Sequence, residues 1–536
     1  MSKNSTLALL SRMRANCSVV LRVMPLRHQP PSLRKACMTV IANHFEKLCY
    51  DCHNQHEMIE MIDSEEYLQY QGPFVHMPGH VLEEMLEVIS ERRALHRKHL
   101  HILMQEQMQN LNLSFGMGDA YHGLEFMKNR CKNLRKLNIS YLRHMNPNIL
   151  LGLVPSFSHL VSLNLRMTLT VDQILGQIGS RCCNLLELNL AATPITDRGL
   201  VLLCVAEDGR RQCQKLARLI VSDTAVTAMG ATVVLQSLPN LREFDYDKIF
   251  DVLEVVERWD QGLEARIFTG AGVRCSAELI QPPSSLRLTT LVSMAEQVRT
   301  EGLEAAARLC PETRTVTLAN AWLPSEALYK LMLFDRLTSI SLTNSEGLTL
   351  DFHEGVLPLL AVCGQRLQNL ILTNFTSVDV SGIGKSCPEL QNLALSNIAT
   401  YEPVGQPCSD IFNQLRALEL WSDPQADLSP YLIRQLLLFC PNMTNLLFKG
   451  CEVLTDKLIA EIWKVNPMKK LSHLTLDHCH CITGQSLQSL LDADNELAVL
   501  RVWSCLNITK YLNIELVHRI RNENLDVYFE WFEYEE

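Results

Sequence analysis

Residues 182–191 read "CCNLLELNLA", and this order of residue types returns along the chain. The stretches "CKNLRKLNIS" (131–140), "CPELQNLALS" (387–396) and "CPNMTNLLFK" (440–449) repeat it. Each has a cysteine followed by apolar residues at Leu-x-x-Leu-x-Leu spacing. The alternation at the end predicts a short strand with its apolar side chains on one face. The first apolar residue of this core falls at Met108, Leu134, Leu160, Leu185, Leu216, Leu241, Leu337, Leu367, Leu390, Leu415, Met443, Leu471 and Leu497, with a looser unit from Thr313.

The spacing of these cores identifies the repeat. Most steps are 23–28 residues, such as 26 from Leu134 to Leu160 and 25 from Leu160 to Leu185. This is the period of leucine-rich repeats. Residues between the cores, such as 197–208, have helical spacing. One repeat cannot bury its apolar face alone, so stacked neighbours must share a continuous core. We therefore expect an α/β leucine-rich-repeat solenoid, or horseshoe, over residues 105–530.

The period falters between residues 247 and 312. Leu241 and Thr313 are 72 residues apart, which leaves room for about two degenerate repeats beyond the one that begins at Leu241. "FDVLEVVERW" (250–259) predicts a helix, whereas "QPPSS" (281–285) predicts a loop. The stretch is either degenerate repeat or a loop that projects from the solenoid.

The composition suits a folded protein that binds other proteins. The 536 residues are 47% hydrophobic and 20% charged, with a formal net charge of −10 and no dominant basic block. Nucleic acid is thus an unfavourable partner. No apolar run is long enough to span a bilayer, and no secretory signal is evident. We expect residues 1–29 to be a flexible tail, with a mitochondrial presequence as the alternative. The 19 cysteines are expected to be reduced, in the cytoplasm, the nucleus or both.

An N-terminal helical region is expected over residues 30–98. After Pro30 and Pro31, Ser32 is a good N-cap, and Leu33, Cys37 and Ile41 follow at steps of four along one side of a helix. This face either packs on the first repeat or binds another protein. If it awaits a partner, Leu33 and Cys37 should be exposed in the isolated chain.

A second helix in this region starts at a proline. Met77, Pro78, Val81 and Met85 form an apolar-Pro-x-x-apolar-x-x-x-apolar pattern. Proline suits the first turn of a helix because its missing N–H has no helical partner there. The pattern therefore places Val81 and Met85 on one helical face.

These features together resemble a known family. The late repeats carry a cysteine three residues after the core, at Cys451, Cys479 and Cys505. They resemble the cysteine-containing leucine-rich repeats of ubiquitin-ligase substrate receptors. The two N-terminal helices resemble a VHL-box, which is an elongin-BC box followed by a cullin-2 box.

The resemblance implies a function and a set of contacts. The chain would be a non-catalytic substrate-recognition subunit of a cullin-RING ubiquitin ligase, without cofactor. Its partners would be elongin B, elongin C, cullin-2 with its RING subunit, and unknown protein substrates. Elongin C would contact Leu33, Cys37 and Ile41, and cullin-2 would contact Met77, Pro78, Val81 and Met85.

Two alternatives stay open. "MPGHVLEEML" (77–86) also resembles the start of an F-box, whose partners would be a Skp-type adaptor and cullin-1. In the other alternative the chain is a leucine-rich-repeat scaffold or inhibitor without a ligase role. Its N-terminal helices would then only cap the apolar edge of the first repeat.

Candidate binding residues lie on the expected concave strand surface. Asn112, Asn138, Asn164 and Asn189 occupy one equivalent position in the first repeats and favour a family-typical filler over a site. In the last repeats the residue directly after the core is Trp421, Lys449, Asp477 or Trp503. Tryptophan beside charged residues is typical of binding hot spots, so these four are the predicted substrate contacts.

No metal site or catalytic centre is predicted. "CYDCH" (49–53) matches a haem-attachment pattern and, with His56, offers zinc ligands, but these crowd into eight residues. In "DHCHC" (477–481), Cys479 is the buried cysteine of its repeat. The chain also lacks a nucleophile elbow and a phosphate-binding loop. The sequence therefore favours binding over catalysis.

Overall fold

The computed structural model describes residues 33–533 apart from 51–71, 92–94, 115–123, 125–126, 129, 207, 259–284, 295–296, 346–349, 403–410, 423–427 and 439. The predicted tail 1–29 and the predicted N-cap Ser32 lie outside the described residues. The chain divides into two compact units. The N-terminal unit holds described residues within 31–323 and 333–336, and the C-terminal unit holds described residues within 324–332 and 337–536.

The N-terminal unit begins with helices and continues as a strand–helix alternation. Its helices are α2 (Leu33–Asn43), α3 (Phe45–Tyr50), α5 (Gly79–Glu91), α6 (Arg97–Leu103), α8 (Pro147–Leu153), η2 (Val154–Ser156), α9 (Asp172–Arg181), α10 (Asp197–Cys204), α11 (Ala228–Ser237), α12 (Ile249–Glu257) and α14 (Thr300–Leu309). Its strands are β1 (Asn110–Asn112), β2 (Lys136–Asn138), β3 (Ser162–Asn164), β4 (Glu187–Asn189), β5 (Arg218–Ile220), β6 (Glu243–Asp245), β7 (Thr290–Ser293) and β8 (Thr315–Ala321).

The C-terminal unit continues the same alternation. Its helices are η4 (Ser325–Leu333), η5 (Phe352–Val356), α15 (Leu357–Cys363), η6 (Gly364–Arg366), α16 (Val380–Ser386), α17 (Pro430–Leu438), α18 (Asp456–Val465), α19 (Gly484–Asp492) and α20 (Lys510–Asn522). Its main strands are β9 (Ser339–Asn344), β10 (Asn369–Thr373), β12 (Asn392–Ser396), β14 (Ala417–Trp421), β15 (Asn445–Lys449), β16 (His473–Asp477), β17 (Val499–Trp503) and β18 (Tyr528–Phe532). A separate two-stranded pair joins β11 (Ser377–Val378) and β13 (Thr400–Tyr401).

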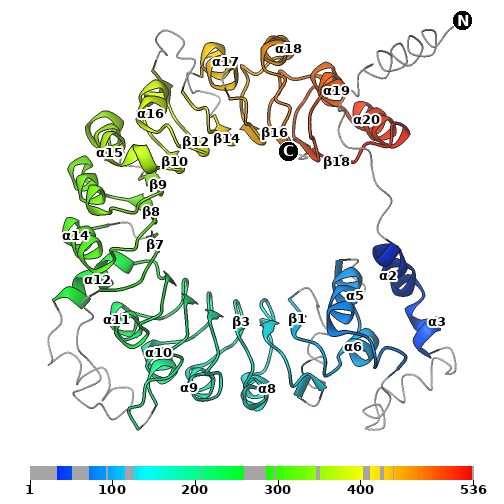
Figure 1. Cartoon of the computed structure of the whole chain (residues 1–536), viewed down its shortest axis with the longest axis vertical. Helices are drawn as coiled ribbons and strands as arrows, with labels where there is room; N and C mark the ends of the chain where they lie inside the picture. The colour runs from blue at the N-terminus through cyan, green and yellow to red at the C-terminus, as the bar shows by residue number, and fades with distance from the viewer. Residues whose placement is uncertain are drawn as a thin grey trace, which may run out of the picture. The chain divides into compact units, whose positions relative to one another are not determined.

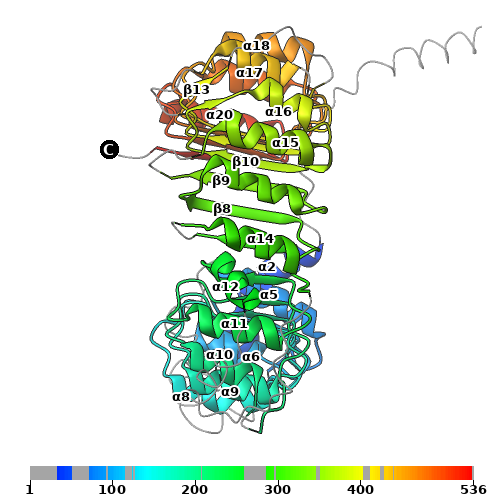
Figure 2. The ribbon, with the colours of Figure 1, turned by 90° about the vertical axis from the view of Figure 1, so that its left-hand side faces the viewer.

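In each unit the strands pair in parallel and in chain order. Leu111, Leu137, Leu163 and Leu188 are in register across β1–β4. Leu418, Leu446, Leu474 and Leu500 are in register across β14–β17. Figure 1 shows the helices between successive strands, such as α8–α11 and α15–α19, on one side of the strands of their unit, and Figure 2 shows β9 and β10 running parallel. The predicted α/β leucine-rich-repeat solenoid is confirmed.

The core of each unit is built from the apolar positions that the repeat pattern predicts. In β14 the burial alternates, with Leu418 and Leu420 buried and Glu419 and Trp421 exposed. Neighbouring helices, such as α9 with α10 and α10 with α11, pack side by side over the strands. Burial of a leucine contributes about 1.5–3 kcal/mol. A stack of such positions therefore replaces the closed core of a globular domain.

The residue two positions after each core has a left-handed backbone in most repeats. Its φ is 53° at Ala192, 62° at Asn374, 52° at Asn397, 66° at Gly450 and 52° at His478. Asparagine and glycine adopt this conformation most readily. This explains why Asn374 and Asn397 lie one position before the cysteines of the later repeats.

The Thr-Asp pairs at the starts of helices link one repeat to the next. The carboxylate of Asp456 accepts hydrogen bonds from the backbone N–H of Thr483 (3.0 Å) and from its hydroxyl (2.6 Å). Asp197 accepts the same two bonds from Thr227, at 2.7 and 2.6 Å. Thr483 and Thr227 are the N-caps of α19 and α11. The aspartate of one repeat thereby fixes the helix start of the following repeat.

We predict that Asp456 stabilises the chain in a pH-dependent manner. Burial raises the pKa of Asp456, but hydrogen bonds from Ser486 and Thr483 outweigh it, so the pKa lies below its ordinary value. The stability contribution is thus complete above the unfolded pKa near 3.9 and is lost as pH falls through the lower folded pKa.

The test of this prediction is urea unfolding at several pH values. Asp456→Ala should lower the free energy of unfolding by about 1.5 kcal/mol at neutral pH, because hydrogen bonds to a partly buried carboxylate are lost. The difference should shrink below pH ~3.9. Asp335→Ala, which removes an exposed carboxylate from a turn in the N-terminal unit, serves as the control. An equal loss at every pH would contradict the prediction.

The irregular stretch 247–312 contains one strand of the sheet. Thr290 of β7 pairs with Glu243 of β6, and β7 continues in register with β8 from Thr290 to Ser293. Helices α12 and α14 lie before and after β7, and they pack on each other. The described residues therefore hold one further repeat, where the spacing left room for about two. Residues 259–284 lie outside the described residues.

The last strand is one that the repeat pattern did not mark. β18 pairs in register with β17, which places Phe529 beside Leu500 and Phe532 beside Trp503. Trp531 donates a hydrogen bond from Nε1 to the carbonyl of Ile508 (2.9 Å). Aromatic residues replace the leucines of the other strands, which is why the Leu-x-x-Leu-x-Leu search missed it.

Candidate functional site

The four predicted substrate contacts form one row across the C-terminal sheet. Trp421, Lys449, Asp477 and Trp503 are the final residues of β14, β15, β16 and β17, and each is in register with the next. Phe532 of β18 continues the row after Trp503. The repeat pattern does not mark Phe532, although Tyr528, Glu530 and Phe532 alternate with Phe529 and Trp531 as in a strand. The row belongs to the solvent-facing side of the sheet.

Charged groups in the row hold its aromatic side chains in place. Lys449 Nζ lies 3.3 Å from Asp477 Oδ2 and 5.1 Å from the centre of the Trp421 ring. The Trp421 residue is 38% exposed, so its ring presents apolar surface beside an ammonium group. A cation over a tryptophan face contributes about 0.5–1 kcal/mol at exposed sites. The Lys449 side chain therefore orders this end of the row.

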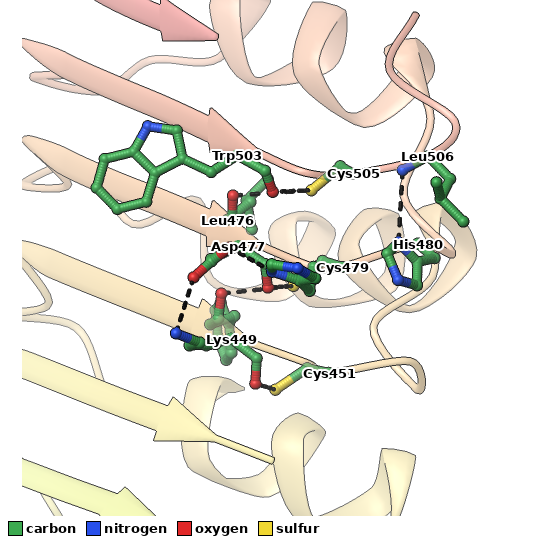
Figure 3. A network of polar contacts seen from close by, with 11 residues as sticks. Lys449, Cys451, Leu476, Asp477, Cys479, His480, Trp503, Cys505 and Leu506 are labelled. Carbon is green, nitrogen blue, oxygen red and sulfur yellow. Dashed lines mark hydrogen bonds and ion pairs between the residues drawn. The ribbon is translucent and has the colours of Figure 1, made fainter. Parts of the chain in front are cut away.

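Asp477 is not an exposed contact, in contrast to the prediction. Its side chain is only 11% exposed, and Oδ1 lies 2.6 Å from His478 Nδ1 while Oδ2 faces Lys449. Figure 3 shows the carboxylate held between its neighbours in the strands. Burial of a carboxylate is costly unless it is paired, so Asp477 is fixed by Lys449 and His478. It positions Lys449, and a partner would meet Trp421, Lys449 and Trp503.

Arg501 extends this network toward β18. The guanidinium lies 6.0 Å from the centre of the Trp503 ring, and Nε donates a hydrogen bond to Glu530 Oε2 (3.1 Å). Glu530 belongs to "EWFEYEE", where the pattern alone indicates only an acidic chain end. In the structure this glutamate pairs with the middle residue of β17. The surface thus combines aromatic rings with paired charges.

The cysteines behind the row connect successive repeats. The thiol of Cys479 donates to the carbonyl of Phe448 (3.5 Å), and that of Cys505 donates to Leu476 (3.7 Å). Cys451 donates to Leu420 in the same way (3.6 Å). Figure 3 shows these thiols next to the strand ends. Burial raises the pKa of Cys451 to about 12 and that of Cys505 to about 11.

We predict that alkylation separates the described cysteines into two classes. At pH 8 a thiol with a pKa near 12 is a thiolate in about one molecule in ten thousand, so Cys451 should not react in the folded chain. The exposed Cys37, Cys183 and Cys481 should react with iodoacetamide. Mass spectrometry of the digested protein shows which cysteines of each class are alkylated. Unfolding in urea should expose Cys451, and labelling of Cys451 in the folded chain at the rate of Cys481 would refute the assignment.

In the N-terminal unit, helix α2 leaves the predicted elongin-binding face open. Leu33 is 81% exposed, Cys37 is exposed and Ile41 is half-buried. Val40, two turns after Leu33, is also 56% exposed and extends the same face. Met38 is buried instead, and Arg34 pairs with Glu84 of α5 at 2.7 Å. The face carried by Leu33 and Cys37 is not packed on the first repeat.

The predicted cullin-binding segment is partly open. Pro78 is exposed, and Met77 and Val81 are half-buried. Met85 is fully buried, so the prediction that Met85 itself contacts a cullin is wrong. The 3.6-residue helical period turns Met85 toward the body of the unit, where it joins Leu82 and Ile89 in the core.

The start of α5 is held tightly against the chain ahead of β1. Gln107 donates hydrogen bonds from Nε2 to the carbonyls of Val75 (2.8 Å) and Met77 (2.9 Å). A Cβ atom on Gly79 would lie 2.1 Å from the carbonyl oxygen of Gln107. Glycine is therefore required at this position, and Pro78 is presented by a rigid turn.

Phe45 of α3 and His99 of α6 form a small aromatic core with Phe74. The Phe45 ring lies 4.7 Å from the His99 ring and 6.0 Å from the Phe74 ring, measured between centroids. Burial, together with the nearby charges of Lys98 and His96, lowers the pKa of His99 to about 4. The His99 ring is thus neutral near pH 7 and packs as part of the core.

Among the described residues, no group of three or more His, Cys, Asp or Glu side chains is arranged to hold a metal ion. In "CYDCH", Cys49 is buried in α3, whereas Cys52, His53 and His56 lie outside the described residues. None of the described helices combines the length and the apolar character that crossing a bilayer requires.

Comparison with solved structures gives distant similarities. No family model matches the chain. The chain is similar to an internalin (inlF) from Listeria monocytogenes, with 15% identity over 78% of this chain and 94% of that chain, at a TM-score of 0.38. It is similar to Rad7 in a yeast complex with Elc1, with 15% identity over 71% of this chain and 97% of that chain, at a TM-score of 0.38. It is also similar to TLR13 in a complex with ssRNA13, with 15% identity over 75% of this chain and 50% of that chain, at a TM-score of 0.37.

Parallel repeats of this kind present extended surfaces that bind other proteins. The in-register strands of each unit have one face that the helices between the strands do not cover. The chain therefore has the fold of a protein-interaction scaffold.

Proposed function

We propose that the chain is the substrate-recognition subunit of an elongin BC–cullin-2 ubiquitin ligase. The observation that carries the proposal is the exposed Leu33 and Cys37 side chains on a helix whose Met38 is buried. A helix anchored by one face and apolar on the other is suited to a partner with a hydrophobic groove. Leu33 would enter a pocket on elongin C, with Cys37, Val40 and Ile41 packed beside it.

The turn at Pro78 supports the second half of the proposal. Pro78 and Val81 offer apolar surface at the start of α5, and Arg34 of α2 is paired with Glu84 of α5. The two helices are thereby linked within one unit, so an adaptor on α2 and a cullin on α5 would be bound side by side. Met85 supports this arrangement from the core and does not contact the cullin.

The mechanism in this proposal is proximity. The N-terminal helices would bind the adaptor and the cullin, and the row from Trp421 to Trp503 would bind the substrate. Holding both in one complex raises the effective concentration of the substrate's lysines near the ubiquitin-loaded enzyme. The chain would contribute binding surfaces and no reacting group.

Affinity purification of the tagged full chain tests which adaptor is bound. Recovery of elongin B, elongin C and cullin-2 is expected, with Cys37 protected from alkylation in the complex. Recovery of a Skp-type adaptor and cullin-1 instead would favour an F-box receptor. Recovery of neither set, from a chain shown to be folded by circular dichroism, would reject the ligase proposal.

We predict that the aromatic row is needed for substrate capture. Trp421→Ala with Trp503→Ala should remove capture of substrate while elongin binding persists, because hot-spot tryptophans contribute about 2 kcal/mol or more each. The measurement is the set of proteins recovered by proteomics when the proteasome is inhibited. Trp322→Ala removes a 55% exposed tryptophan elsewhere and serves as the control. Unchanged substrate recovery by the folded double variant would contradict the prediction.

A further inference from the structure

A groove in the N-terminal unit lies between helix α5 and the solvent-facing side of the first strands. Its volume is about 1260 Å³, and it reaches from Glu91 on α5 to Asn164 on β3. Pockets for small molecules usually measure about 300–1,000 Å³. Leu86 and Leu95 contribute to its lining, and Asn110 and Lys136 lie on its strand side. The groove is thus large enough for a segment of polypeptide.

One wall of the groove is a row of amide groups. Asn112, Asn138 and Asn164 are in register on β1, β2 and β3, and all three line the groove. Each amide oxygen accepts a hydrogen bond from the backbone N–H two residues later: Asn138 from Ser140 (3.1 Å) and Asn164 from Arg166 (3.0 Å). Within the described residues, none of the three NH₂ groups donates a hydrogen bond in turn. The row therefore presents donors that suit carbonyl oxygens.

The facing wall is acidic. Glu83, Glu84, Glu87 and Glu91 lie on one stripe of α5 and line the groove. Glu83 is used within the fold, where it accepts hydrogen bonds from the N–H groups of Gln109 (2.7 Å) and Asn110 (2.8 Å). Glu84 pairs with Arg34.

The other two carboxylates of the stripe are accessible to a ligand. Glu87 and Glu91 are exposed and form no ion pair with another described residue. Of the described residues that line the groove, Lys136 alone is a lysine or arginine. The groove therefore favours cations.

We propose that this groove binds an extended segment of a partner protein with Lys or Arg at two alternate positions. Glu87 and Glu91 are one helical turn apart, about 6 Å along the axis. Alternate side chains of an extended chain point to the same side and are about 6.8 Å apart. The two cations would pair with Glu87 and Glu91, while carbonyls of the segment accept hydrogen bonds from Asn138 and Asn164. This surface is separate from the Leu33–Cys37 face and does not depend on elongin binding.

The probe is a fluorescein-labelled threonine–valine peptide with lysine at two alternate positions. Its binding to the full chain is measured by fluorescence anisotropy. Glu87→Lys with Glu91→Lys should weaken binding about tenfold or more, since two charge pairs are replaced by repulsion. Glu301→Lys with Glu452→Lys changes the net charge equally at exposed positions outside the groove and should have little effect. Equal weakening in both double variants would overturn the proposal.

A second pair of variants tests the amide row. Serine keeps an oxygen that accepts the N–H two residues later but lacks the amide donor. Asn138→Ser with Asn164→Ser should weaken the lysine peptide several-fold, at about 0.05 M and about 0.5 M NaCl alike, whereas the glutamate contribution should fade at high salt. Unchanged affinity in this variant would overturn the proposed contact, as would equal binding of a peptide with glutamate in place of lysine.

A final experiment distinguishes two possible occupants of the groove, a partner protein and the chain's own N-terminal segment. Residues 1–29 contain Lys3 and four arginines and no acidic residue. Deletion of residues 1–29 should leave the affinity for the peptide unchanged. Binding of the peptide only after this deletion would show that the chain's own segment occupies the groove, and would overturn the proposal of a partner protein.

Discussion

Replacing Leu33 with lysine and Cys37 with aspartate should abolish binding of elongin B–elongin C to the full chain. Leu33 is 81% exposed and Cys37 is exposed, so the folded chain tolerates both changes. Burial of a leucine side chain contributes about 1.5–3 kcal/mol to binding, and an unpaired charge in an apolar pocket costs about 3 kcal/mol or more. Together these terms predict a loss of affinity of about a thousandfold or more.

The control for this variant lies on the next helix. Leu48 of α3 is 52% exposed but lies outside the predicted face, so Leu48→Lys should bind elongin B–elongin C with unchanged affinity. Isothermal titration calorimetry gives both affinities, and the melting temperature reports on folding. Wild-type affinity in the folded double variant would rule out Leu33 and Cys37 as elongin C contacts. Loss of binding in Leu48→Lys alone would move the contact to α3.

Replacing Phe45 with alanine should destabilise the N-terminal helical region by about 3–5 kcal/mol. Phe45 is almost fully buried, and its ring packs against Phe74 and His99. The cavity left by the missing ring would loosen α3. Because α3 contacts α2, it would loosen α2 as well. Because the exposed face of α2 must be held in place to bind a partner, elongin affinity should fall even though no proposed contact residue is changed.

Hydrogen exchange measured by mass spectrometry distinguishes this effect from general unfolding. Amides of α2 and α3 should exchange faster in Phe45→Ala, whereas those of β14–β17 should not change. Leu48→Ala truncates an exposed side chain on the same helix and should alter exchange little. Unchanged protection of α3 in Phe45→Ala would show that the aromatic core does not hold this region.

Most of the repeat architecture could be predicted because its signals are local. The cores at Leu137, Leu188 and Leu446 each alternate within six residues, and the structure pairs them with their neighbours as the period requires. Two regions differed. β18 uses aromatic residues such as Phe529 in place of leucine, and the single strand β7 occupies the stretch where the spacing left room for more.

The candidate sites were predicted less completely, because exposure depends on contacts between distant segments. The alignment of Trp421, Lys449 and Trp503 follows from the period, but the burial of Asp477 follows from its pairing with Lys449 and His478. The acidic stripe of α5 is visible in the sequence. Its position opposite Asn112, Asn138 and Asn164 is not, since α5 precedes those strands by tens of residues.

The sequence by itself therefore determined the period, the strand positions and the apolar stripe of Leu33, Cys37 and Ile41. These depend on side-chain alternation within a few residues, which the backbone geometry of strands and helices converts directly into faces. Only the tertiary structure decided which faces are covered. Met38 and Met85 are buried while Leu33 remains open, because packing of α2, α5 and the first strands selects one side of each helix. The sequence defines the stripes, and packing decides which of them a partner can reach.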